Sequence, residues 1–152
     1  MKLDYLMSYE GTLSPASQPV GRGPFGDRMI AEVTGGTFEG SRLRGQLLTC
    51  GGDWLLVAPD GFGRLDVRLT LCTDDGAQIY CQYTGVLEMN EKVVSALAAG
   101  SGTEFGDQYF MTQPRFETGH EQYAWLNNIV AVAQGRFTPD GIAYEMFACM
   151  GD

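Results

Sequence analysis

The sequence predicts an all-β protein, a single antiparallel β-barrel of about eight or nine strands, lipocalin-like in shape, with one short helix. Three observations support this. The chain has 21 glycines in 152 residues, nearly double the average usage of about 7%, and glycine serves turns, bulges and barrel corners. Residues 65–73 alternate apolar and polar side chains, as a strand does. Turn-forming triplets with Asp-Gly follow at short spacing.

The first half of the chain divides into strands separated by glycine and proline. Residues 3–10 alternate weakly and predict a first strand, and residues 11–26 are rich in Gly, Pro and Ser and predict a long loop. Further strands are expected at residues 29–33, 42–49 and 53–57. Pro59-Asp60-Gly61 then predicts a turn.

The second half contains the clearest strand and the predicted helix. Residues 65–73 turn at Asp74-Asp75-Gly76 into a partner strand, residues 77–89. Asn90 is a suitable N-cap for a helix that ends at Gly100. That helix would carry Val93, Val94, Leu97 and Ala98 on one side. The remaining elements are a loop at 101–107, a strand at 108–112 ended by Pro114, a loop at 113–121 and strands at 123–137 and 142–150.

Composition restricts the classes of partner. The length suits one domain, residues 1–152. A net charge of −9 with only ten Lys and Arg disfavours binding to nucleic acid or to anionic membranes. The sequence has no apolar run long enough for a membrane span, and its start lacks the apolar region of a signal peptide. We therefore expect a cytoplasmic protein whose four scattered cysteines are reduced.

Several motifs together carry a resemblance that extends over roughly residues 28–150. These motifs are Gly35-Gly36 with Phe38-Glu39-Gly40, Gly51-Gly52-Asp53-Trp54, Asp60-Gly61, Leu65-Asp66-Val67-Arg68, Thr73-Asp74-Asp75-Gly76-Ala77, Ile79-Tyr80, Tyr109-Phe110 with Pro114, Phe116-Glu117-Thr118 and Tyr123-Ala124-Trp125-Leu126-Asn127. With them the sequence resembles the domain-of-unknown-function family numbered 3237, a bacterial and fungal group. The resemblance implies a barrel fold that is often oligomeric, and it implies no common activity and no catalytic residues.

Several kinds of chemistry are disfavoured by what the sequence lacks. The single histidine, His120, cannot form a His-rich metal site, and the cysteines lack metal-ligand spacing, so we expect no metal. Gly21-Arg22-Gly23-Pro24-Phe25-Gly26 matches a dinucleotide-binding spacing but lacks its strand-turn-helix context. No organic cofactor is therefore predicted.

The strand at residues 65–73 carries the most informative polar group. Asp66, Arg68 and Thr70 share one face, and Leu65, Val67, Leu69 and Leu71 share the other. If the polar face lines the barrel, Asp66 and Arg68 form a buried pair able to orient a carbonyl and move a proton. The apolar row would then lie outside and predicts a homodimer or larger oligomer. The alternative is a solvated polar face with the apolar row filling the barrel.

Aromatic and loop residues suggest a pocket for a flat ligand. Glu117 is a second candidate acid or base, and Tyr80 a candidate proton donor, or either has only a structural role. The predicted ligand-binding residues are Asp53, Trp54, Tyr109, Phe116, Tyr123, Trp125 and Asn127, of which the last three would share one face of a strand.

Three functions fit these features. The first is a cofactor-independent isomerase, lyase or cyclase acting on a small aromatic or polyketide-like carbonyl compound, with Asp66 or Glu117 as base, Arg68 as stabiliser of an oxyanion, and Tyr80 or Tyr109 as proton donor. The second is a non-catalytic small-molecule-binding protein. The third is a structural oligomeric barrel filled by its own side chains.

Overall fold

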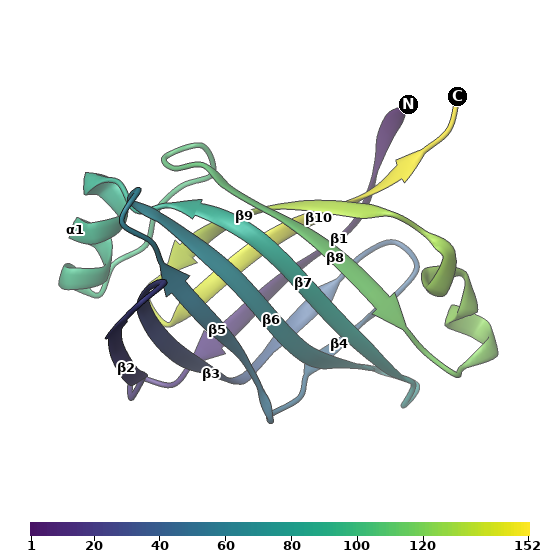
Figure 1. The fold of residues 1–152 in the computed structure, drawn as a ribbon. Helices are drawn as coiled ribbons and strands as arrows, with labels where there is room; N and C mark the ends of the chain where they lie inside the picture. The colour runs from purple at the N-terminus through teal and green to yellow at the C-terminus, as the bar shows by residue number, and fades with distance from the viewer.

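Ten antiparallel strands form a ring that closes where β1 pairs with β3 (Figure 1). The computed structural model describes all residues 1–152. Around the ring β1 is followed by β10, β9, β8, β7 and β6, and then β4 and β5 share the place between β6 and β3. The elements are β1 Lys2–Leu13, β2 Gln18–Gly23, β3 Gly26–Glu39, β4 Arg44–Leu47, β5 Gly51–Val57, β6 Phe62–Thr73, β7 Gln78–Glu88, α1 Glu91–Ala99, β8 Phe110–Glu117, the 3-10 helix η1 Glu121–Asn128, β9 Ala131–Thr138 and β10 Gly141–Met150.

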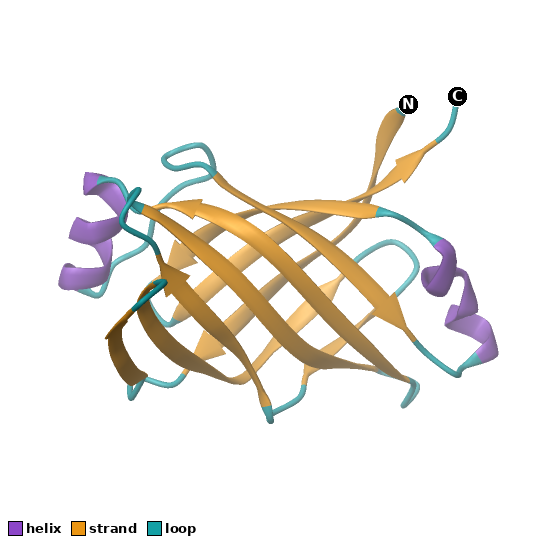
Figure 2. Cartoon of the chain, in the orientation of Figure 1, coloured by secondary structure: helices purple, strands orange, loops and turns teal.

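The predicted fold class is confirmed. Strands form the whole wall, and the two helices lie at opposite ends of the barrel (Figure 2). Closure depends on a close approach of β1 and β3, where a Cβ on Gly36 would come within 2.1 Å of the carbonyl oxygen of Glu10. Only glycine fits there. Closing the sheet removes most of the free strand edges that an open sheet of this size would expose. Neither helix is long or apolar enough to cross a membrane.

The prediction of a long loop at residues 11–26 is wrong. β1 continues to Leu13, and β2 and the start of β3 form a hairpin. The glycines and prolines are compatible with this because β2 pairs only with β3. One side of an edge strand has no neighbouring strand. A proline such as Pro19 is tolerated in such a strand, because no partner on that side needs its missing N–H.

The predicted strand end at Pro114 is also wrong. β8 continues to Glu117 and stays in register with β7 along its whole length. Its pairing with β9 is limited to Met111 and Thr112. Pro114, which has no N–H to donate, therefore lies beyond the point where β8 and β9 separate.

The predicted strand at residues 123–137 is divided between η1 and β9. Local anchors explain the helix. The Tyr123 hydroxyl donates to Asp75, and the Asn127 side chain exchanges two hydrogen bonds with the Thr118 backbone. These contacts hold the segment against the ends of β7 and β8. Period-two alternation cannot anticipate them, because both partners lie outside the segment: Asp75 is 48 positions from Tyr123 and Thr118 is nine positions from Asn127.

The helix predicted at residues 90–99 is confirmed as α1. The Asn90 side chain accepts a hydrogen bond from the Val93 N–H at 3.1 Å, and Gly100 ends the helix with a φ of 63°. Its buried residues are Val93 and Ala96. Val94 and Leu97, which were expected on the same side as Val93, are exposed.

Candidate functional site

The inner surface of the barrel carries the apolar row of β6, not its polar row. Leu65, Val67, Leu69 and Leu71 are each no more than 6% exposed. Of the two arrangements that the sequence left open, the structure therefore has the solvated polar face, with the apolar row filling the barrel, and the catalytic interpretation of the polar face as a barrel lining is wrong. Alternation shows that a strand has two faces but not which one is inside. The interior is desolvated, and burying each apolar side chain contributes about 1.5–3 kcal/mol, whereas a buried charge is costly.

The residues expected to be catalytic on β6 lie on the outer surface. Asp66 and Arg68 form an ion pair at 3.6 Å between half-exposed side chains, and the Arg68 guanidinium lies 5.5 Å from the centre of the Trp54 ring. Thr70 lies on the same outer face. The surface that was predicted to mediate assembly is therefore inside the barrel and buried. Its residues are Val67, Leu69 and Leu71.

The inner wall instead holds a carboxylate. Asp53 on β5 lies directly opposite Val67 on β6, and Val67 lies opposite Tyr83 on β7. Directly opposed residues on antiparallel strands project from the same face of the sheet. Because Val67 belongs to the core, Asp53 and Tyr83 also point inward. Asp53 was predicted from sequence as a ligand-binding residue, not as an acid or base.

Three tyrosines form a buried cluster on this wall. The hydroxyls of Tyr9 and Tyr83 are hydrogen bonded, and the centre of the Tyr144 ring lies 5.1 Å from that of Tyr9 and 5.4 Å from that of Tyr83. Gly135, opposite Tyr144 on β9, makes room for this ring, since a Cβ there would lie 2.8 Å from Tyr144 Cε1. The cluster therefore brings together side chains from β1, β7 and β10.

The protonation of Asp53 is set mainly by burial. Burial raises the pKa of Asp53 to about 6, and the nearby Asp66 carboxylate adds to this, while the Asp66 N–H and Arg28 act in the opposite direction. The Asp66 N–H donates to Asp53 Oδ1 at 3.0 Å, at a place where the β5–β6 pairing is interrupted. Asp53 can therefore gain and lose a proton close to neutral pH.

The three buried tyrosines, unlike Asp53, do not change protonation near neutral pH. Burial raises the pKa of Tyr9, Tyr83 and Tyr144 well above its usual value, and the charge of Asp53 adds to this at Tyr9 and Tyr144. At neutral pH they are neutral hydroxyls that can donate hydrogen bonds. A carboxylate that changes protonation beside phenols that do not is a combination suited to moving a proton and stabilising an oxyanion.

The two ends of the barrel differ in how well they cover the interior. At the η1 end, Tyr123 and Leu126 are buried, and the Arg42 guanidinium lies 3.6 Å from the centre of the Trp125 ring. At the α1 end, the inward-facing residues Met29 and Val57 are only partly buried. Asp53 shares the inner face of β5 with Val57, which lies four residues further along the strand.

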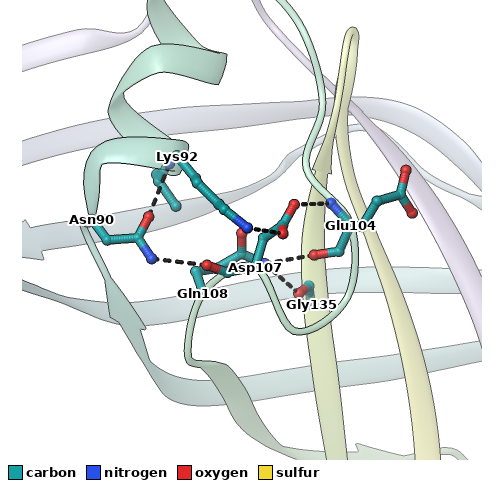
Figure 3. Close-up of polar contacts among 7 residues, drawn as sticks. Asn90, Lys92, Glu104, Asp107, Gln108 and Gly135 are labelled. Atoms are coloured by element: carbon teal, nitrogen blue, oxygen red, sulfur yellow. Dashed lines mark hydrogen bonds and ion pairs between the residues drawn. The ribbon is translucent and has the colours of Figure 1, made fainter.

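A polar network holds α1 over the more exposed end (Figure 3). Lys92 Nζ donates to Asp107 Oδ1 at 2.6 Å, and Asn90 Nδ2 donates to the Asp107 carbonyl at 2.9 Å. Gln108 Nε2 donates to the Gly135 carbonyl at 3.2 Å. The loop between α1 and β8 is thus tied both to the helix and to the strand that accommodates Tyr144.

Removing the Asp107 carboxylate should loosen this covering. Asp107→Ala deletes the acceptor of Lys92 and of the Glu104 N–H, so amide hydrogen exchange in residues 101–108 and in α1 should accelerate about tenfold. Exchange in β6, in the barrel wall, should not change. Asp60→Ala, which also removes a surface carboxylate paired with a cation, is the matched control. Unchanged exchange at α1 in Asp107→Ala would contradict the proposed anchoring.

The other residues predicted from sequence lie in separate places. Tyr80 and Glu117 face each other across β7 and β8 on the outer surface, beside a hollow of about 280 Å³ that Asn127 also lines. Phe116 is in the core, and Tyr109 is exposed. Tyr80 and Glu117 are therefore brought together, but away from Asp53 and from the tyrosines.

Tyr9, Tyr83 and Tyr144 were not predicted from sequence. A signal for Tyr83 was present, because it continues the alternating row of Ile79 and Cys81 on the strand that pairs with β6. Assigning the apolar rows to the interior would have placed Tyr83 there. No group of three or more His, Cys, Asp or Glu residues is placed to hold a metal ion, and the absence of bound metal from the purified protein stays a prediction.

Fold and site together define a closed antiparallel β-barrel with an acid and a phenol cluster on its inner wall. The chain belongs to the family of proteins of unknown function DUF3237, whose model matches residues 1–149. A UPF0311 protein of Rhodopseudomonas palustris is 31% identical over 80% of this chain and 79% of its own length.

Solved structures agree with this assignment. A β-barrel-like protein of Acinetobacter baumannii is 34% identical, with a TM-score of 0.83 over 97% of this chain and 94% of its own. A conserved protein of unknown function from R. palustris has a TM-score of 0.87 at 27% identity, with 99% of each chain covered. A protein of Penicillium herquei described as an enzyme shares the fold, with a TM-score of 0.72 at 20% identity over 97% of this chain and 92% of its own.

Proposed function

We propose that this barrel is a cofactor-independent acid–base enzyme, an isomerase, lyase or cyclase, acting on a small aromatic or polyketide-like carbonyl compound. The observation that carries the proposal is the inward-facing Asp53 carboxyl, with its pKa raised to about 6, on the same inner wall as three neutral phenols, two of which its charge affects. The description of the P. herquei relative as an enzyme supports it at the level of the fold.

In this proposal Asp53 is the base that removes a proton from carbon next to the substrate carbonyl. The electron pair of the broken C–H bond forms an enolate, and a tyrosine hydroxyl donates a hydrogen bond to the developing oxyanion. Tyr144 is the best placed donor because the hydroxyls of Tyr9 and Tyr83 are hydrogen bonded to each other, and because the charge of Asp53 acts on the Tyr144 hydroxyl. The aromatic rings of the cluster favour a flat substrate, which would enter past Met29 and Val57.

Proton abstraction can be measured without knowing the natural substrate. We expect the protein to catalyse deuterium incorporation into the methyl group of 4-hydroxyacetophenone in D₂O, followed by proton NMR. Asp53→Asn should reduce the rate about 100-fold or more, within the usual range for a general base, and Tyr144→Phe about tenfold. The parent rate should rise with pH through about 6, as Asp53 ionises.

Asp66→Asn is the discriminating control. It removes a carboxylate on the outer face and keeps the backbone N–H that donates a hydrogen bond to Asp53. It should retain the parent rate. Loss of exchange in Asp66→Asn with retention in Asp53→Asn would reverse the assignment.

One observation favours a structural barrel instead. Tyr9, Tyr144 and Phe110 are among the largest fully buried side chains, so the protein's own aromatic rings occupy much of the interior. A protein that neither binds 4-hydroxyacetophenone, by ligand-observed NMR, nor exchanges its protons would support this alternative. Binding without exchange would support a small-molecule-binding protein.

A further inference from the structure

A long groove lies on the outer surface, over β6 to β9 and away from Asp53. It has a volume of about 890 Å³, and the outward-facing row that lines it is the one in which Arg64, Val86, Met111 and Gln134 are paired across the four strands. A second hollow of about 440 Å³ shares Thr84, Gln113 and Val132 with it. The two hollows therefore form one continuous recessed face.

This recessed face is apolar and exposed. Tyr109, Met111 and Val130 lie in it, exposed by 54%, 42% and 69%. Leu3 and Phe147 form one wall of the groove. A soluble protein rarely leaves such a set of neighbouring apolar side chains uncovered, and exposed patches of this kind mark interaction sites.

The charge of the face distinguishes it from the rest of the molecule. No Asp or Glu lines either hollow, and the charged lining residues are Arg64 and Arg115. The chain as a whole has 19 acidic residues and a net charge of −9. Two copies of this chain therefore repel each other over most orientations, but they can meet at this face without bringing carboxylates together.

A ridge stands beside the groove. Residues 2–5 of β1 and residues 147–150 of β10 pair with each other and project beyond the barrel wall (Figure 1). Residues 2–5 have no other strand beside them, because β3 pairs with β1 only from Ser8 onward. Leu3 and Tyr5 share the outer face of this ridge with Phe147, and both are about half exposed.

We propose that a second copy of this chain occupies the groove, with the ridge of each copy lying in the groove of the other about a two-fold axis. An apolar ridge next to an apolar groove on one surface is self-complementary, which is what a two-fold interface requires. The interface buries Leu3 and Tyr5 of one copy against Met111 and Val132 of its partner. Val67, Leu69 and Leu71 of β6 were expected to form the surface through which copies associate, but they are buried inside the barrel. The ridge and groove take their place in this proposal.

Sedimentation equilibrium of the untagged protein between about 1 and 100 µM tests association first. The parent should be a dimer. Leu3→Glu on the ridge and Met111→Lys in the groove should each raise the dissociation constant about 100-fold or more, because each buries an unpaired charge. Val94→Glu, at an exposed apolar residue of α1 away from this face, should leave the dimer intact. Circular dichroism confirms that each variant is folded.

Mixing the two variants tests the ridge-in-groove arrangement itself. In the mixed dimer the carboxylate introduced on the ridge of one copy meets the ammonium group introduced in the groove of the other, while the second ridge and groove pair is unaltered. An equimolar mixture of Leu3→Glu and Met111→Lys should therefore dimerise although neither does so alone. A monomeric parent, singly substituted variants that remain dimeric, or a mixture that stays monomeric would each overturn the proposal.

Discussion

Asp53→Asn should raise the free energy of unfolding by about 1–3 kcal/mol at pH 8 and leave it nearly unchanged at pH 4. The folded-state pKa of Asp53 is raised from 3.8 to about 6. Between these values the folded state keeps a proton that the unfolded state has released, so stability falls as pH rises through this window. The asparagine side chain keeps an oxygen that can accept the hydrogen bond from the Asp66 N–H, but it cannot ionise.

Urea unfolding of the parent and of Asp53→Asn between pH 4 and pH 8 measures this effect. The parent should lose stability relative to the variant up to about pH 6, above which their difference becomes constant. Asp66→Asn should show the same form of profile as the parent because Asp53 is still present, with the window ending at a slightly lower pH because the Asp66 carboxylate no longer raises the pKa of Asp53. Parallel profiles of Asp53→Asn and the parent over the whole range would show that Asp53 ionises alike in the folded and unfolded states.

Gly135→Ala should lower the free energy of unfolding by about 1–3 kcal/mol, the usual cost of overpacking a core. The added Cβ would lie 2.8 Å from Tyr144 Cε1 and 2.9 Å from two atoms of the Phe110 ring. Both rings are buried and cannot move away freely. Urea unfolding at pH 7 gives the change, and side-chain NMR should show a displaced Tyr144 ring.

Gly119→Ala is the matched control for this substitution. Its Cβ would meet no atom within 4 Å, and its backbone φ is not in the left-handed region. It should change stability by no more than about 0.5 kcal/mol. Equal effects at Gly135 and Gly119 would mean that the tyrosine cluster tolerates displacement and is not tightly packed.

The fold was predictable because the alternation is strong where a strand has one apolar face. Residues 65–73 and their partner strand are found as expected, at β6 and β7. The cap at Asn90 and the stop at Gly100 define α1 equally well. The errors at residues 11–26 and at Pro114 have a common cause. Local composition disfavours a strand there, but an edge strand, or a strand that separates from its neighbour, tolerates proline.

The site was harder to predict because it depends on pairing between distant strands. Asp66 and Arg68 attracted attention because their alternation is clear, but only closure of the ring decides which face is desolvated. Asp53 becomes an inner-wall residue through its register opposite Val67. Tyr9, Tyr83 and Tyr144 are 61 or more positions apart in sequence and meet only across the barrel.

The most direct measurement of the central claim is the titration of the Asp53 carboxyl carbon by ¹³C NMR, assigned by comparison with Asp53→Asn. Asp53 is proposed to be a buried acid–base group on the inner wall. A midpoint of about 6 is predicted. A midpoint at or below 4, the ordinary range of a solvated aspartate, would contradict the account and leave Asp53 as one more charge at the surface.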